Sequence, residues 1–202
     1  MIWIVLAVAL TWGVCMPLHD RFKRNGKKAL SLVFKAIPTC FAAAFAGHAA
    51  LSGLGQDAYA RLIFAGLCVC VLADVALDIR VEAGGALFFA GHLLYVAAMS
   101  LYRPPSWWCL TLFALSACGL LYFASHYRSA APSRLILCGA TVYGFALAAL
   151  LGFGVPLPFL AFSGRAVLAA AGAALFVASD LTLCHNTVRR KPASWHYASL
   201  GI

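Results

Sequence analysis

The chain is poor in charged residues, which make up 10% of its 202 positions, and only six residues are acidic. Soluble domains carry about 25% charged residues, so this chain has too few polar groups to cover a water-facing surface. Hydrophobic residues make up 64%, and this composition predicts a protein whose solvent is lipid. The formal net charge is +9, and its carriers lie mostly in short segments between apolar runs. That placement is typical of contacts with membrane lipids and indicates no nucleic-acid partner.

Three further absences narrow the class of protein. The apolar runs lack the two-residue alternation of membrane β-barrels, which excludes that fold. The eight cysteines include no CxxC pair, so we interpret them as packing residues and expect no thiolate metal site. No charged segment precedes the first apolar run, and no A-x-A-like cleavage site precedes Pro17. This run is therefore expected to be a retained span rather than a signal peptide.

The long apolar runs predict an all-α fold, a polytopic transmembrane helix bundle of about seven or eight spans that forms a single domain over residues 1–202. About 20 apolar residues cross a bilayer as a helix, and a helix satisfies its own backbone groups where lipid offers no partners. Turn residues such as Asn25-Gly26, Gly84-Gly85 and Pro104-Pro105 separate the runs. The spans are expected near residues 1–18, 29–52, 58–80, 84–102, 106–126, 134–153 and 164–185.

The Lys and Arg residues predict the orientation of these spans. Cytoplasmic loops are enriched in positive charge. Alternate loops hold most of the cations, whereas the opposite loops hold only Arg61, Arg103 and Arg165. The N-terminus is therefore expected outside and residues 186–202 in the cytoplasm. The membrane itself is expected to be a bacterial inner membrane. The cations on the predicted cytoplasmic side are Arg21, Lys23, Arg24, Lys27, Lys28, Arg80, Arg128, Arg134, Arg189, Arg190 and Lys191.

Acidic residues inside the predicted spans are the first candidates for a functional site. An ionisable group in a span is energetically expensive and usually faces the bundle interior. Asp74 and Asp78 lie one helical turn apart on one face, and Asp180 lies within a later span. An ion pair with Lys35 would be a purely structural alternative for Asp74 and Asp180. For Asp78, the structural alternative is solvation at the membrane interface beside Arg80.

Other polar residues could join these acids, because their spans place them at similar depths. His92 and Tyr95 lie three residues apart in GHLLYV, although a single histidine often serves only helix packing. His185 and Asn186 follow the last span and could bind a headgroup or simply meet water. Ser179 lacks a GxSxG elbow, so a hydroxyl bonded to its own helix is the more natural interpretation than a nucleophile.

These residues occur in runs that resemble the YhhN-type lysoplasmalogenase family. The resemblance covers most of the chain and includes LVFKAIPT at Lys35, with Pro38 displaced from the usual proline position. Two features depart from the family pattern: Ala73 stands where a glycine is usual, and family members usually end with an eighth span, whereas this sequence stops at Ile202, just after WHYASLGI. The matching positions are Gly66, Leu67, Asp74, Leu77, Gly85, Phe89, His92, Tyr95, Gly172, Leu175, Phe176, Ser179 and Asp180.

The resemblance implies hydrolysis of the vinyl ether bond of lysoplasmalogens, with a lysophospholipid as substrate. Such a bond is cleaved by protonation of its β-carbon, and an acid in a low-dielectric pocket suits that step because burial disfavours the charged form. A second carboxylate could activate water or stabilise the cation. We assign Asp74 and Asp180 to this pair and expect both in one cavity. His92 and Tyr95 are predicted to position water or hold a carboxylate.

The remaining predicted site residues would bind the substrate, and the reaction needs no cofactor and no metal. Lys35, His185 and Asn186 are candidates to meet the phosphate, and Asp78 and Ser179 complete the predicted binding set. A zinc-dependent lipid amidase, using His92 with two aspartates, is one alternative. A small proton-coupled transporter or lipid-binding protein is another, although no internal repeat supports it.

Overall fold

The computed structural model describes residue 6 and residues 9–52, 57–126 and 134–189, and every secondary-structure element in these ranges is helical. The predicted all-α fold is therefore confirmed. The chain divides into two compact units, residues 1–91 and residues 92–200, and the helix α5 (Val81–Tyr102) contributes to both. Each unit is described by itself below, and the single domain expected from the sequence stays a prediction.

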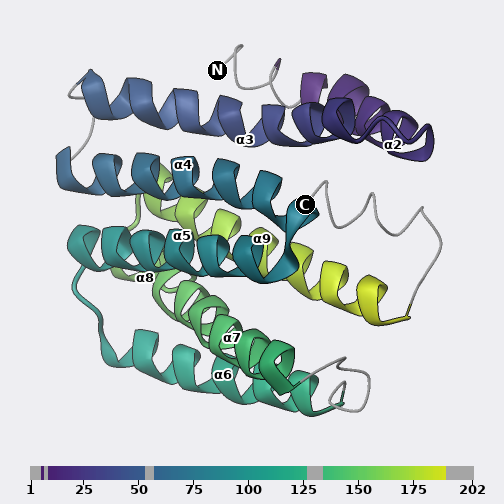
Figure 1. Ribbon diagram of the computed structural model, residues 1–202. Coiled ribbons are helices and arrows are strands. Elements are labelled where there is room, and N and C mark those ends of the chain that lie inside the picture. Colours follow the sequence, from purple (N-terminus) through teal and green to yellow (C-terminus); the bar gives the residue numbers. More distant parts are fainter. Residues whose placement is uncertain (1–5, 7–8, 53–56, 127–133, 190–202) are drawn as a thin grey trace. The chain divides into compact units, whose positions relative to one another are not determined.

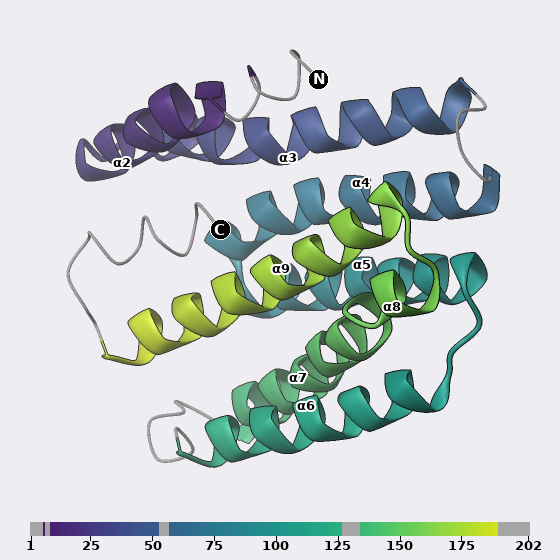
Figure 2. The same cartoon turned by 180° about the vertical axis from the view of Figure 1, so that it is seen from behind.

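The first unit consists of helices that pack side by side in antiparallel order (Figures 1 and 2). A short helix folds back along the start of α3, and α4 lies beside α3. A β-carbon added at Gly47 would come 2.9 Å from the ring of Phe64, so the absent side chain is what lets α3 approach α4. The elements are a π-helical turn at Thr11–Cys15, α2 at Met16–Arg24, α3 at Lys28–Leu51, α4 at Asp57–Ile79 and the first part of α5.

The second unit contains the remainder of α5 and a helical hairpin that packs against the last helix. A β-carbon on Gly152 would come 2.7 Å from Phe113, so this glycine sets the close contact within the hairpin. The hydroxyl of Tyr102, at the end of α5, lies 2.8 Å from that of Ser163. The elements are α6 at Trp107–His126, α7 at Arg134–Gly154, α8 at Leu157–Leu160 and α9 at Gly164–Arg189.

Six of these helices are long and apolar enough to cross a membrane. They begin within a few residues of the predicted spans, so the chain is an integral membrane protein. The first predicted span, 1–18, lies partly outside the described residues. Its described part forms the π-helical turn and the beginning of α2.

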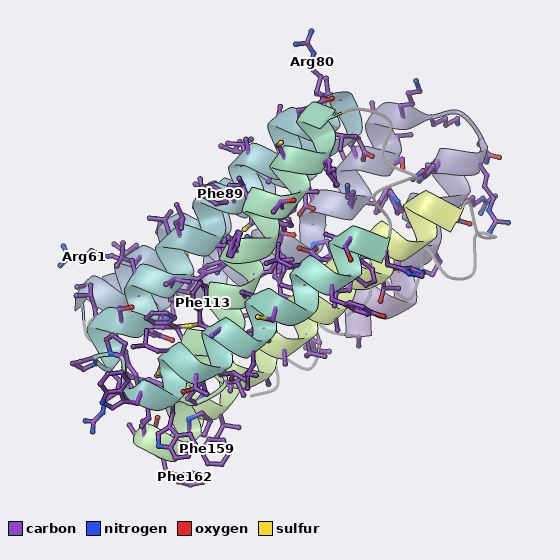
Figure 3. All side chains as sticks on the ribbon, turned by 90° about the horizontal axis from the view of Figure 1, so that it is seen from below. Arg61, Arg80, Phe89, Phe113, Phe159 and Phe162 are labelled. Carbon is purple, nitrogen blue, oxygen red and sulfur yellow. The ribbon has the colours of Figure 1, made fainter. Side chains whose placement is uncertain are left out.

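Large apolar side chains on the outer surfaces of both units agree with lipid as the solvent. Leu72 is 60% exposed and Leu115 is 65% exposed. Phe159 and Phe162 project from one end of the second unit (Figure 3), and both are almost fully exposed. Within the first unit, Arg61 and Arg80 point outward from opposite ends of α4.

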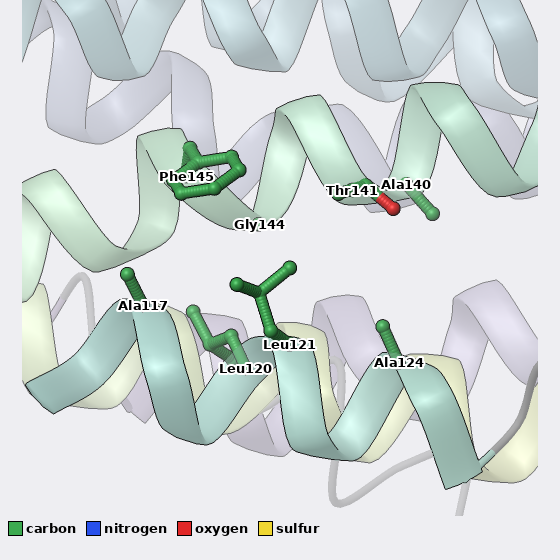
Figure 4. A pocket seen from close by; sticks show the side chains of 8 residues that line it. All are labelled: Ala117, Leu120, Leu121, Ala124, Ala140, Thr141, Gly144 and Phe145. Carbon is green, nitrogen blue, oxygen red and sulfur yellow. The ribbon is translucent and has the colours of Figure 1, made fainter. Parts of the chain in front are cut away.

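A shallow apolar groove lies between α6 and α7 (Figure 4). Its lining includes Thr141, whose hydroxyl donates to the carbonyl of Leu137 at 2.9 Å, so that polar group is satisfied within its own helix. None of the predicted site residues lines this groove. The lining residues are Ala117, Leu120, Leu121, Ala124, Ala140, Thr141, Gly144 and Phe145.

Candidate functional site

Two pairs of polar residues face one another across α3 and α4 in the first unit. The spacing of four residues within each helix stacks Lys35 above Thr39 and Asp74 above Asp78. The Thr39 hydroxyl donates a hydrogen bond of 2.7 Å to Oδ2 of Asp74. Asp74 is half-buried, so this bond fixes a carboxylate oxygen that has left bulk water.

Lys35 pairs with Asp78 in this unit. Its Nζ lies 3.4 Å from Oδ2 of Asp78 and donates to the backbone carbonyl of Asp74 at 3.2 Å. The Lys35 side chain is 9% exposed and that of Asp78 is 35% exposed. The structural ion pair considered for Lys35 is thus formed with the outer acid of α4, whereas the Asp74 carboxylate is held by a hydroxyl. The Asp78 side chain is partly exposed as well as paired with Lys35, and its role in substrate binding stays a prediction.

His92 lies at the buried centre of a cluster of aromatic rings in the second unit. It is 0% exposed, and three rings meet it edge-on at steep angles. Their centroids lie 6.2 Å away for Tyr95 on the same helix, 5.4 Å for Tyr143 on α7 and 4.6 Å for Phe176 on α9. The rings of α5, α7 and α9 therefore restrict how the imidazole can turn.

Asp180 on α9 accepts a hydrogen bond from the hydroxyl of Tyr143. Tyr143 thus connects the acid to the histidine, because its hydroxyl bonds the carboxylate while its ring contacts His92. Asp180 and the neighbouring Ser179 are both half-buried. The side chains of the predicted headgroup residues His185 and Asn186 lie outside the described part of the structure.

The arrangement within each unit has one shared feature: an acid on an apolar helix accepts a hydrogen bond from a hydroxyl on a neighbouring helix. Such a bond fixes the orientation of the carboxyl group. The structure brings Lys35 together with Asp74 and Asp78, and His92 together with Tyr95. The expectation that Asp74 and Asp180 share one cavity stays a prediction, since they belong to different units.

Two of these partners were not expected from the sequence. Thr39 follows Lys35 by one helical turn, and the same spacing separates Asp74 from Asp78. This matching spacing could have indicated Thr39 as a partner of Asp74. Tyr143 lies in the middle of α7, and no matching spacing of polar residues on that helix points to Asp180. Within the described ranges, no three His, Cys, Asp or Glu side chains are close enough together to hold a metal ion.

Comparison with known proteins agrees with the resemblance seen in the sequence. A model of the YhhN family matches residues 30–200, a range that holds every predicted site residue. Helix α2 and the turn after it precede that range. No curated protein and no solved structure matches the chain.

Proposed function

Because the chain belongs to the YhhN family, whose members are known as lysoplasmalogenase-like, we propose that it hydrolyses the vinyl ether bond of lysoplasmalogens. The products are a fatty aldehyde and a glycerophospho-alcohol. The observation that carries the proposal is the pair of intramembrane acids, Asp74 and Asp180, each oriented by a hydroxyl from another helix.

The reaction begins with proton transfer to carbon. One carboxylic acid gives its proton to the β-carbon of the vinyl ether, and the electron pair of the double bond forms the new C–H bond. The ether oxygen then shares the positive charge as an oxocarbenium ion. Low-dielectric surroundings favour the neutral form of a carboxyl group, and apolar helices supply such surroundings.

The second stage consumes water. A carboxylate accepts a proton from water as its oxygen adds to the oxocarbenium carbon, which gives a hemiacetal. The hemiacetal then collapses: the first carboxylate takes the hydroxyl proton, the C–O bond to glycerol breaks, and the leaving alcohol takes the proton that the second carboxyl had accepted from water, so that the aldehyde remains. Each carboxyl returns to its starting protonation state, so the sum is one water added and one ether bond broken.

The residues around the acids have supporting roles in this proposal. Thr39 and Tyr143 act as positioning residues, since each bonds one carboxyl oxygen and so orients the acid. His92 and Tyr95 belong to the same cluster as Asp180 through the ring of Tyr143. Lys35 pairs with Asp78 in the structure. In this proposal, Lys35, His185 and Asn186 bind the substrate phosphate.

The experiment that tests the proposal follows aldehyde release from a lysoplasmalogen by the purified, detergent-solubilised protein. In deuterium oxide, the aldehyde is expected to carry one deuterium on the carbon beside its carbonyl, because that carbon receives the catalytic proton. The alkyl ether analogue, which lacks the double bond, is expected to remain intact. Absence of aldehyde, or aldehyde without deuterium, contradicts the proposed protonation.

Variants connect the reaction to the two acids. Asp74→Asn and Asp180→Asn are each expected to lower kcat by roughly 10²–10⁴-fold, the usual contribution of a general acid or base. Asp20→Asn is the matched control, since that acid lies outside the predicted site and pairs with Arg24. Full activity in both site variants would remove the assignment. Inhibition by chelators would favour the zinc amidase alternative, and proton-coupled uptake without aldehyde would favour a transporter.

A further inference from the structure

The segment from Asp20 to Lys28, at the end of α2 and the start of α3, concentrates positive charge. It holds a single acid, and Oδ2 of that acid, Asp20, lies 2.5 Å from Nε of Arg24. The segment therefore keeps a large positive excess. All of its cations are exposed; they are Arg21, Lys23, Arg24, Lys27 and Lys28.

Two contacts below this segment fix it against α3. The buried ring of His19 places Nδ1 2.8 Å from the carbonyl oxygen of Ser31 and 3.0 Å from its hydroxyl. The rings of Phe22 and Phe34 stack with centroids 5.4 Å apart. Gly26 allows the tight reversal between them, with a φ of 71° that side chains rarely adopt. The cations are thus presented by an ordered helical hairpin.

The hairpin stands where the polar headgroups of a bilayer are expected. Helix α3 begins at Lys28 and is long and apolar enough to cross a membrane, so its first residues lie near the lipid–water boundary. Cations at this depth would lie at the level of the lipid phosphates. Clusters of Lys and Arg beside a transmembrane helix attract anionic lipids for this reason, and salt screens the attraction.

We propose that the α2–α3 hairpin, residues 19–34, is a binding surface for anionic phospholipid headgroups of the bilayer around the protein. Phosphatidylglycerol has the required chemistry, a phosphate with no compensating ammonium group. Phosphatidylcholine carries the same phosphate with a fixed positive charge and so serves as the neutral comparison. The surface is independent of the candidate acids and of the proposed reaction.

The experiment measures lipid selectivity of the full chain in reconstituted membranes. Spin-labelled phosphatidylglycerol and phosphatidylcholine report by electron paramagnetic resonance how much of each lipid is immobilised by the protein. The test variant is R21Q/K27Q/K28Q. The matched control is R61Q/R103Q/R165Q, which removes the same number of exposed cations elsewhere. Circular dichroism and thermal unfolding establish that both variants keep the helical fold.

The wild-type protein is expected to prefer phosphatidylglycerol several-fold over phosphatidylcholine, and high salt is expected to reduce that preference. The hairpin variant should lose most of the preference, whereas the control variant should retain it. An equal loss in the two variants would assign the effect to net charge alone and overturn the proposal. No preference in the wild-type protein would overturn it as well.

Discussion

At the scale of single residues, the hydroxyl of Tyr143 has a role that its ring does not share. The hydroxyl donates to Asp180, while the ring contacts His92. A variant that lacks only the Tyr143 hydroxyl therefore distinguishes the orientation of Asp180 from the packing of the rings around His92. Tyr102 offers the matched case, because its hydroxyl also bonds a side chain from another segment, that of Ser163.

Tyr143→Phe is expected to lower kcat for aldehyde release by roughly ten- to a hundredfold, with little change in KM. Hydrogen bonds to charged groups contribute about 1.5–3 kcal/mol, and an acid without its donor spends less time in the reactive orientation. Steady-state kinetics with a lysoplasmalogen measure the change. Tyr102→Phe should leave kcat near the wild-type value. Equal losses in the two variants would mean that Tyr143 has only a structural role.

The candidate acids could be found from the sequence because acids inside apolar runs are rare and costly. Their hydrogen-bond partners could not. A threonine or a tyrosine inside a helix is ordinary, and only the register between two helices decides that Thr39 meets Asp74. The same register explains why Lys35 pairs with Asp78 rather than with the carboxylate of Asp74.

At the scale of helices, the six long spans follow from the length and apolarity of the runs, and their predicted positions agree with the structure. The short helices were not predicted as such. Helix α8 occupies only Leu157–Leu160, within a proline-containing segment that predicts a break. Proline at the first helical turn costs nothing, because its missing N–H would have no partner there, so a short helix and a break produce the same sequence pattern.

Gly152→Ala is expected to destabilise the α6–α7 hairpin. Its new β-carbon would come within 2.8 Å of the Phe113 backbone, which can move only if the helices separate. Overpacking of this kind costs about 1–3 kcal/mol, and thermal unfolding in detergent, followed by circular dichroism, measures the loss.

Gly139→Ala on the same helix is the control for that substitution. Apart from the backbone of its own helix turn, no atom lies within 4 Å of the added carbon there, and alanine favours a helix over glycine by up to about 1 kcal/mol. The two variants should therefore shift the unfolding temperature in opposite directions. A lower unfolding temperature in both variants would show that α7 tolerates alanine at neither position. The close contact with Phe113 would then not explain the effect at Gly152.

At the scale of the whole molecule, the composition already determined the solvent, because so few charges cannot cover a water-facing surface. The positive-inside orientation, with the N-terminus outside, stays a prediction. The expectation that Asp74 and Asp180 lie together also stays a prediction. It depends on the way in which several helices assemble rather than on a local sequence pattern. The kinetics of single and double variants can test this second prediction without a measured distance between the two acids.

The double variant Asp74→Asn/Asp180→Asn is expected to be about as slow as the slower single variant. Catalytic groups that act on one substrate as a unit lose almost all of their effect when either is removed, so their losses do not add as free energies. Two independent sites behave differently, because their losses multiply: two reductions of roughly 10²-fold would give about 10⁴-fold. Single-turnover measurement of aldehyde release distinguishes these outcomes. Multiplied losses would separate the two acids into different functions and leave the proposed reaction with only one of them.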